Sequence, residues 1–274
     1  MTEVEGGPGA LHESLVRVRI RLFAIQRELA GTREVSVSLR TPATIEHAWT
    51  ALVALHPVLV PGRSSVRFAR NGTWAGPEEP LEDGDEVAMI PPVSGGAAED
   101  GGIEAPATVR RATTQRVLEL RPEPFAETIL ADLASRLASP ADGAVVGFLG
   151  ITRESPGTPA PGQEAEATRH AGRAVQALEY EALEPMALGI LAGIADEIAE
   201  RFGVTRLAIV HRTGSVPLGQ ASIAIVACAP HRSAAFAAAA YAIDETKARA
   251  PIWKAEQFTD GHLWIGEPPR DGPA

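Results

Sequence analysis

The chain has almost no cysteine. Cys228 is the single cysteine among 274 residues, so no disulfide can form within the chain. One thiol also cannot supply the several thiolate ligands of a typical structural zinc site. No HExxH motif or closely spaced histidine pair is present, and we expect no metal centre. Cys228 lies in the apolar run SIAIVACAP, which predicts a small buried thiol.

Long apolar runs and an excess of basic charge are missing as well. No run approaches the ~18 residues of a spanning helix, and the start, MTEVEGGPGALHES, has no apolar segment typical of a secretory signal. We therefore expect no membrane association and a cytoplasmic location. The 35 acidic residues outnumber the 25 basic ones, giving a net charge of −10. Nucleic-acid binders are usually basic, so we expect no nucleic-acid partner.

Lysine is nearly absent too. Of the 25 basic residues, 23 are arginine and only Lys247 and Lys254 are lysine. Lysine can lose its proton when its pKa is depressed, whereas arginine cannot, so these two positions indicate a need for an amine. The alternatives are chance retention on a solvated face and helix C-terminal charges that complement the helix dipole.

The spacing of the two lysines suggests how they could act together. Pro251 disfavours a helical conformation at Ala250, which ends the preceding helix near Arg249 and places Lys254 on the next element of the chain. Two ammonium groups that converge across this turn lower each other's pKa. One could then act as a neutral base or nucleophile while the other holds an anion.

Five more residues are candidates for anion binding. His231 and Arg232 come after Pro230 at the start of a long predicted helix, where free backbone N–H groups favour anions. Arg153 stands where a predicted strand enters a long loop, and His211-Arg212 is a weaker pair at another strand end. Ordinary surface placement is the alternative for each.

The chain divides into two predicted domains. Residues 1–14 and 268–274 predict disordered tails, and residues 97–116, rich in Gly, Pro and charge, predict a linker. Between them lie domains at 15–96 and 117–267, both with mixed strands and helices, so the predicted fold class is α+β.

Residues 15–96 predict the order β-β-α-β-β. Strands are expected at 15–23, 34–40, 65–72 and 86–90, from their alternation and bounding turns. The helix starts at Thr44, with His47 in place of a capping-box glutamate, so we expect an incomplete box. Ala48, Leu52 and Leu55 share one helical face.

The second domain predicts three helices and several strands. Helices are expected at 124–137, 185–202 and 231–249, and strands at VLEL, GAVVGFLGITR, AVQALEYEAL, RLAIVHRTGSV, ASIAIVACAP, IWKAEQF and HLWIG. A loop of 19 residues, 154–172, predicts a lid or a disordered segment.

Gly95-Gly96 comes after the last strand of the first domain, separated from it by Pro91-Pro92-Val93-Ser94. An extended tail without side chains can enter a narrow channel and expose its carbonyl. The alternative is a linker that begins with two glycines, because Gly101-Gly102 stands shortly afterwards.

These residues resemble a known family. Residues 15–96, with the β-grasp order and terminal Gly-Gly, resemble the small ubiquitin-like subunit of molybdopterin synthase. Residues 117–266 resemble its large catalytic subunit in GAVVGFLGITR, LEYEALEPMA, IVHRTGSV, APHRSAAF and KARAPIWK. The last two stretches are the most specific, and the two resemblances cover about 85% of the chain, so the protein looks like a fusion of both subunits.

The resemblance implies sulfur transfer in molybdenum cofactor biosynthesis. In that family a thiocarboxylate on the small subunit's terminal glycine delivers sulfur to cyclic pyranopterin monophosphate, making the dithiolene of molybdopterin in two rounds. By analogy Lys247 and Lys254 match the active-site lysines, Arg153, His231 and Arg232 match the substrate pocket, and Gly95-Gly96 matches the sulfur-carrier tail. The family also implies an adenylating and sulfurating enzyme as partner, a homodimer through the C-terminal domain, and no permanently bound cofactor.

Gly96 is not a chain end here, and a thiocarboxylate needs a free carboxylate, so we expect processing after Gly96 in an active sulfur carrier. The loop at 154–172 is also longer and richer in proline than the family implies. Two other functions remain open. One is a ubiquitin-like binding module fused to a non-catalytic dimeric scaffold, and the other is a Schiff-base lysine enzyme such as an aldolase.

Overall fold

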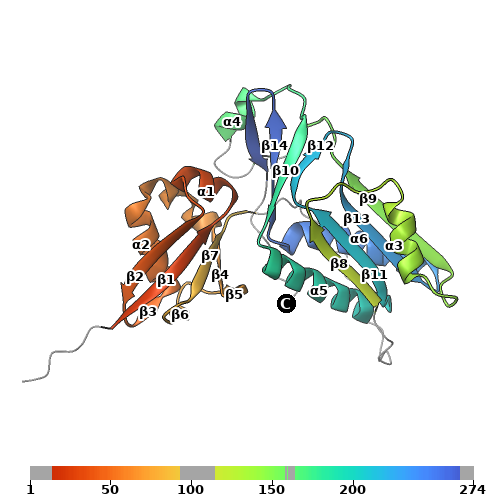
Figure 1. The fold of residues 1–274 in the computed structure, drawn as a ribbon, viewed down its shortest axis with the longest axis horizontal. Helices are drawn as coiled ribbons and strands as arrows, with labels where there is room; N and C mark the ends of the chain where they lie inside the picture. The colour runs from red at the N-terminus through yellow and green to blue at the C-terminus, as the bar shows by residue number, and fades with distance from the viewer. Residues whose placement is uncertain (1–13, 93–114, 158, 160–163, 266–274) are drawn as a thin grey trace, which may run out of the picture. The chain divides into compact units, whose positions relative to one another are not determined.

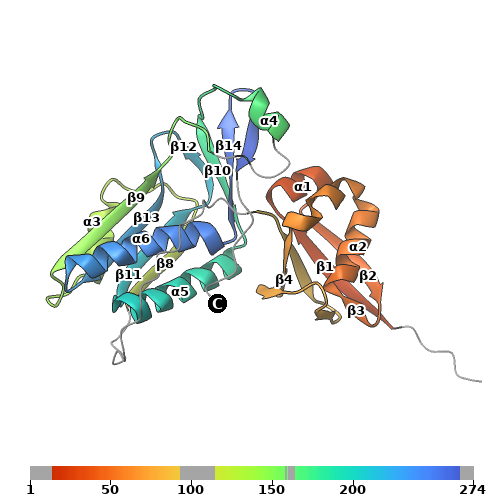
Figure 2. The same ribbon diagram turned by 180° about the vertical axis from the view of Figure 1, so that it is seen from behind.

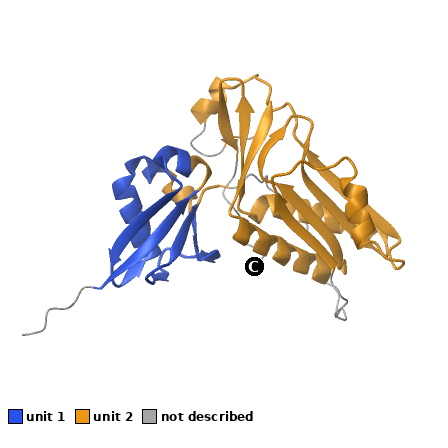
Figure 3. Ribbon diagram, viewed as in Figure 1, with its two compact units in different colours: residues 1–22, 26–61, 67–89 blue, residues 23–25, 62–66, 90–274 orange. Residues whose placement is uncertain are grey.

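The structure, a computed structural model, describes residues 14–92, 115–157, 159 and 164–265. The chain forms two compact units (Figure 3). Their bounds are 1–22, 26–61 and 67–89 for the first unit, and 23–25, 62–66 and 90–274 for the second. In the described part of the chain, no helix is long and apolar enough to cross a membrane.

Some predictions fall outside the described residues. They are the tails at 1–14 (except Ser14) and 268–274, the Gly95-Gly96 pair, and the linker 97–116 up to residue 114. The final two residues of that linker, Gln115 and Arg116, belong to a strand instead.

A five-stranded sheet forms the first unit, and its core results from alternation. Val16, Val18, Ile20 and Leu22 are buried, whereas the residues between them are exposed or half-buried. The strands are β1 (Leu15–Leu22), β2 (Glu34–Arg40), β4 (Arg67–Arg70), β5 (Thr73–Ala75) and β7 (Glu86–Ile90). Their order is β2-β1-β7-β4-β5, with β1 antiparallel to β2 and parallel to β7. A separate two-stranded sheet pairs β3 (Ala43–Thr44) with β6 (Pro80–Leu81).

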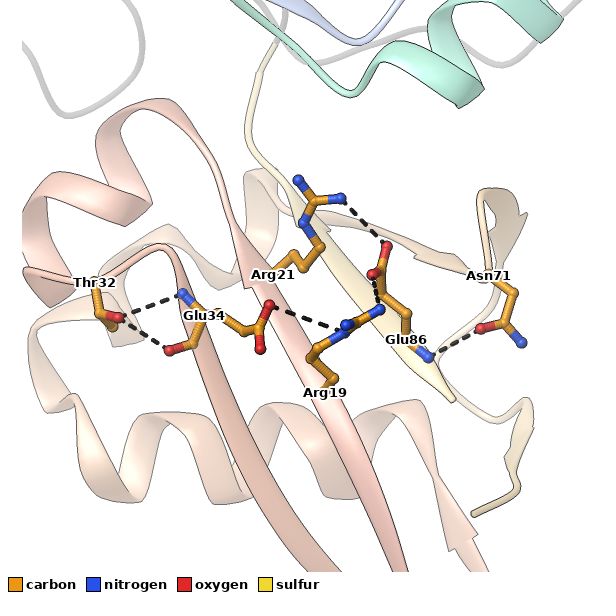
Figure 4. Close-up of polar contacts among 6 residues, drawn as sticks. All are labelled: Arg19, Arg21, Thr32, Glu34, Asn71 and Glu86. Carbon is orange, nitrogen blue, oxygen red and sulfur yellow. Dashed lines mark hydrogen bonds and ion pairs between the residues drawn. The ribbon is translucent and has the colours of Figure 1, made fainter. Parts of the chain in front are cut away.

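Charged pairs hold neighbouring strands together on the exposed side of this sheet (Figure 4). Arg19 on β1 lies 2.7 Å from the Glu86 carboxylate on β7 and 3.9 Å from the Glu34 carboxylate on β2. Arg21 reaches the same Glu86 carboxylate at 3.5 Å. The Glu86 backbone N–H donates to the Asn71 side-chain oxygen at 2.9 Å, which ties the β4–β5 turn to β7.

Helix α2 (Ile45–Leu55) corrects two predictions. The capping box is complete, because the Thr44 hydroxyl accepts from the His47 backbone N–H and His47 Nδ1 accepts from the Thr44 backbone N–H at 3.1 Å. A neutral imidazole nitrogen can therefore replace the usual glutamate oxygen. Leu55 is exposed and not part of the apolar face, because the helix ends there and the chain turns into the 3₁₀ segment η1 (Pro57–Ser65).

The sequence prediction missed a helix between the first two strands. Helix α1 (Ala24–Ala30) lies where the sequence predicted only a turn. Ala24 enters it with a positive φ of 47°, and Gly31 leaves it at 69°. The helix has seven residues and too few turns to show a repeating apolar pattern.

The second unit is built on a four-stranded sheet covered on both faces. Its strands are β8 (Gln115–Arg121), β9 (Ala144–Ile151), β11 (Arg206–Arg212) and β13 (Ala221–Ala229), in the order β8-β11-β13-β9. Helices α5 (Glu184–Phe202) and α6 (Arg232–Arg249) cover one face, and α3 (Ile129–Leu137) covers the other (Figures 1 and 2). Alternate residues of β13 serve the two cores, since Ile223 and Ile225 face α5 and α6 whereas Cys228 belongs to the α3 side. Cys228 is buried as predicted.

A smaller sheet adjoins this layer. It consists of β10 (Ala177–Ala182), β12 (Gly214–Pro217), β14 (Ile252–Phe258) and β15 (Gly261–Ile265), in the order β12-β10-β14-β15. Together the sheets and helices confirm the α+β class. Helix α3 begins at Ile129 and not at Pro124, because Phe125 reaches the core from the preceding non-helical segment and Thr128 stands at the N-cap.

The predicted structureless loop at 154–172 contains a helix. Residues Glu164–Arg169 form α4, which has no buried residue of its own. The next residue, His170, is buried and stacks on Phe258 of β14, with ring centroids 4.3 Å apart. Stacking on the small sheet therefore anchors part of a segment whose composition alone indicated a loop.

Candidate active site

A cavity of about 250 Å³ lies where the two sheets of the second unit meet α6. Three cationic residues line it: Arg153 after β9, Lys247 on α6 and Lys254 on β14. Glu256, Tyr180, His211 and Ser222 are its main other polar residues. The structure thus brings together three of the five residues that the sequence singled out for catalysis and substrate binding.

The corner between α6 and β14 places the two lysines at one cavity. Helix α6 ends at Arg249, as Pro251 predicts, and Ala250 leaves it in an extended conformation with φ −70° and ψ 131°. The backbone N–H of Ala250 still donates to the Thr246 carbonyl, so the helix end remains closed. Lys254 comes next on β14, where it pairs with Tyr180 of β10.

Electrostatics distinguish Lys254. Burial lowers the pKa of Lys254, Glu256 opposes this shift, and the charges of Lys247 and Arg153 add to it. Among the described residues, no acidic oxygen lies within 4.0 Å of the side-chain nitrogens of Arg153, Lys247 or Lys254. The cavity therefore holds concentrated positive charge that a bound anion can neutralise.

His211 forms part of the cavity wall as a neutral ring. Its Nδ1 lies 2.7 Å from the Arg212 carbonyl oxygen, which can only accept, so Nδ1 carries the proton. The pKa of His211 is lowered to about 4, chiefly by burial. The hydrogen bond to the Arg212 carbonyl opposes this shift, and the charge of Lys247 contributes to it. The neutral ring then has its free lone pair on Nε2.

Two hydroxyl groups, those of Tyr180 and Ser222, also line the cavity. The Tyr180 hydroxyl donates to Ser222 Oγ at 3.1 Å, and the Ser222 hydroxyl donates to the Gly150 carbonyl at 3.3 Å. The Tyr180 ring also meets His211 edge to face at 4.9 Å between centroids. Burial raises the pKa of Tyr180, so it stays a neutral phenol.

Glu256 is the acidic member of the described cavity lining. Its Oε1 accepts from the Gly157 backbone N–H at 2.7 Å, which ties the segment after β9 to β14. Burial raises the pKa of Glu256, whereas the Gly157 N–H, Lys254 and Arg153 lower it.

His231 and Arg232 lie elsewhere in the same unit. They line a second cavity of about 450 Å³ at the start of α6, together with Gly143, Pro230 and Ser233. Both side chains are exposed, and His231 stands at the N-cap without a side-chain capping bond. Only glycine fits at position 143 beside Pro230, because a Cβ there would lie 2.5 Å from the Pro230 carbonyl oxygen. Within one chain, then, these residues do not join the lysines.

The sequence reasoning did not select Glu256, Tyr180 or Ser222, and it ranked His211 low. Glu256 had a usable signal, because it stands two residues after Lys254 and strand alternation puts both side chains on one face. Tyr180 and Ser222 had none, since they come from strands whose pairing is not evident from the sequence.

Two protein-family models match this chain. Residues 120–249 match the MoaE protein family, and residues 20–96 match the ThiS family. The molybdopterin synthase catalytic subunit of Bacillus subtilis is 40% identical over 125 residues, covering 46% of this chain and 71% of that protein. The human molybdopterin synthase catalytic subunit is 37% identical over 142 residues, covering 52% and 68%. A crystal structure of molybdopterin synthase from Staphylococcus aureus aligns with a TM-score of 0.44 and 33% identity, over 58% of this chain and all of that one.

Proposed function

We propose that this chain transfers sulfur to cyclic pyranopterin monophosphate. The chain belongs to the family of molybdopterin synthase catalytic subunits, and it carries a ThiS-family domain before the catalytic part. The family places the chain in molybdenum cofactor biosynthesis. The observation that carries the proposal is the cavity lined by Arg153, Lys247 and Lys254, whose side-chain nitrogens have no acidic oxygen within 4.0 Å among the described residues. Such a site suits a phosphorylated substrate.

The three cations have separate roles in this proposal. Lys247 and Arg153 hold the phosphate of the substrate, since both line the cavity and both are solvent-exposed. Lys254, whose pKa burial lowers, supplies the amine that moves a proton during sulfur transfer. In each of two rounds the carrier's carbon–sulfur bond breaks and sulfur bonds to a substrate carbon, whose bond to oxygen breaks. The displaced oxygen stays on the phosphate as the cyclic ester opens, or leaves as water, and a water molecule provides the oxygen that restores the carrier's carboxylate.

The sulfur carrier in this proposal is the Gly95-Gly96 tail of the same chain. Near its start, in the second unit, the Pro91 carbonyl accepts from Trp253 Nε1 at 3.0 Å, and Trp253 is adjacent to Lys254. Adenylation and sulfuration act on a carboxylate, whereas an internal Gly96 offers a peptide carbonyl. The active form is therefore cut after Gly96, and an adenylating and sulfurating enzyme is its partner.

A homodimer through the second unit would complete the substrate pocket. His231 and Arg232 form an exposed cationic site apart from the lysines, so they serve the same substrate only if another copy presents them. Strand β9 is an edge strand with exposed Val145 and Ile151, a surface that a second copy can cover.

The test measures molybdopterin formation by the protein purified from its native host, together with its intact mass. We expect a chain cut after Gly96 and active. Gly96→Pro should resist cutting and lose activity, whereas the control Gly101→Pro in the same linker should retain both. An uncut Gly96→Pro protein with normal activity would contradict the tail as the carrier. Absence of any turnover by the cut protein with a thiocarboxylated tail would instead favour the non-catalytic scaffold.

Borohydride trapping tests the remaining alternative. A Schiff-base lysine enzyme forms a reducible imine with a carbonyl substrate, which adds the substrate's mass to Lys247 or Lys254 after reduction. We expect no such adduct with the pyranopterin substrate, and peptide mass spectrometry would detect one.

A further inference from the structure

Ser222 lies at an irregularity of strand β13. Along the β13–β9 ladder Ala221 pairs with Ile151 and Ile223 pairs with Gly150, so Ser222 is an extra residue of β13. Neighbouring residues of a regular strand point to opposite faces, whereas a β-bulge changes the direction of a side chain. Ser222 and Ile223 accordingly line the same cavity. The bulge therefore gives the cavity a hydroxyl group that regular alternation would turn to the other face of the sheet.

The Ser222 hydroxyl tethers Tyr180. Ser222 donates to the Gly150 carbonyl, which can only accept, so the Tyr180 hydroxyl is the donor of the 3.1 Å bond to Ser222. The Tyr180 ring also contacts His211 edge to face, with an angle of 76° between the ring planes. A hydrogen bond at the end of the ring and an aromatic contact along it therefore fix a buried phenol in one orientation.

Lys254 is the neighbour of this phenol across the small sheet. Tyr180 and Lys254 are directly opposite in the antiparallel β10–β14 pair, and both line the cavity. Side chains in this relation project from the same face, with Cβ atoms about 5 Å apart. The fixed ring is thus adjacent to the stem of Lys254. Burial is the largest of the effects that lower the pKa of Lys254, and a ring in this place contributes to that burial.

We propose that Tyr180, tethered by Ser222, is a positioning residue for Lys254, because its ring keeps the amine in place and shields it from water. This inference rests on the proposed function, in which Lys254 moves a proton. It adds two residues to which that function gives no task. Tyr180 and Ser222 act through Lys254 and not on the substrate.

A purely structural role for the bond between Tyr180 and Ser222 makes a different prediction. Loss of either hydroxyl would then lower the free energy of unfolding and leave Lys254 unaffected. In the proposed role, loss of one hydroxyl leaves the other short of a partner inside the cavity. A buried polar group in this situation recruits water. Water near the amine weakens the effect of burial, so the pKa of Lys254 rises towards its ordinary value.

The experiment follows the titration of the Lys254 amine in the full-length chain by NMR. Reductive methylation with isotope-labelled formaldehyde gives two lysine signals, because Lys247 and Lys254 are the only lysines of the chain. We expect Tyr180→Phe and Ser222→Ala each to raise the Lys254 midpoint by roughly one pH unit, a fraction of the shift that full burial produces. The double variant should shift no further than the larger single variant, because both changes remove the same hydrogen bond.

The other tyrosine of the chain provides the matched control. Tyr241 donates to Glu197 at 2.7 Å, between helices α6 and α5, and it is not among the described residues that line the cavity. Tyr241→Phe removes a bonded hydroxyl of the same kind and should leave the Lys254 midpoint unchanged.

An unchanged or lowered Lys254 midpoint in either single variant would overturn the proposal in favour of a structural bond. An equal rise in Tyr241→Phe would overturn it as well, because the effect would then reflect a general loosening of the fold. Additive shifts in the double variant would overturn the tether. Sulfur transfer is assayed separately, so a Tyr180-dependent midpoint in a protein without turnover would refute the proposed function and leave this inference standing.

Discussion

Cationic side chains are used differently in the two units. On the sheet of the first unit, Arg19 and Arg21 share Glu86, and Arg70 binds Asp85 at 2.7 Å. In the cavity of the second unit, Arg153, Lys247 and Lys254 have no acidic oxygen within 4.0 Å among the described residues. Paired cations connect strands, whereas unpaired cations that line a cavity remain available to a ligand. The presence of a partner thus separates structural from functional charge.

The cavity lysines test this difference most strongly. We expect Lys247→Ala and Lys254→Ala each to lower molybdopterin formation by ~10²–10⁴-fold, the usual cost of losing a proton-transfer group or a preorganised charge. The fold should persist, because neither side chain forms an ion pair with another described residue. Lys254→Arg should rescue poorly, since guanidinium stays charged. Turnover near the wild-type level in Lys254→Arg would contradict the role of an amine there.

A paired cation in the second unit should show the opposite behaviour. The Asp142 side chain is 1% exposed, and it binds Arg206 through both oxygens, at 2.7 Å for Nε–Oδ2. The Arg206 hydrogen bond is the largest effect on the pKa of Asp142, which is lowered. Asp142→Ala leaves a partly buried guanidinium without a partner and should destabilise the unit by about 3 kcal/mol. Urea-dependent hydrogen exchange of β11 and β13 measures this loss, and unchanged exchange would contradict it.

His211 predicts how the cavity responds to acid. Its pKa is about 4 in the folded protein and about 6.5 when unfolded. Between these values the unfolded state binds the proton and the folded state does not, so stability falls as pH drops from 6.5 towards 4. The total loss is about 3 kcal/mol.

Hydrogen exchange of β11 and β13 as a function of pH checks this prediction. His211→Gln should flatten the pH dependence, whereas His56→Gln in the first unit should leave it unchanged. A wild-type second unit that is equally stable at pH 4.5 and pH 7 would contradict the neutral, buried imidazole.

The smallest effect is expected on the first sheet. The Arg19 side chain is 53% exposed, and exposed ion pairs contribute little because water and salt screen them. Arg19→Ala should lower the free energy of unfolding by less than about 0.5 kcal/mol and leave molybdopterin formation unchanged. Urea denaturation of the full chain measures the free energy of unfolding. A larger loss would mean that this charged face does more than connect strands.

Local rules predicted most elements but not their assembly. Alternation located β1, β2 and β7 almost to the residue, and Pro251 correctly ended α6. Helices α1 and α4 escaped because seven or six residues are too few to show a period, and tertiary contacts such as His170 on Phe258 hold them. The convergence of Lys247 and Lys254 was predictable from one turn. Tyr180 and His211 reach the cavity through pairing between distant strands, which no local pattern encodes.

Helix α6 also fixes the distance between Arg232 and Lys247 and the rotation about the helix axis from one to the other. At 1.5 Å per residue, the fifteen steps from Arg232 to Lys247 separate the two ends by about 22 Å, farther than a small phosphorylated molecule spans. One inserted residue would turn Lys247 by about 100° relative to Arg232 and remove one of them from its cavity. The length of α6 should therefore be invariant among active homologues.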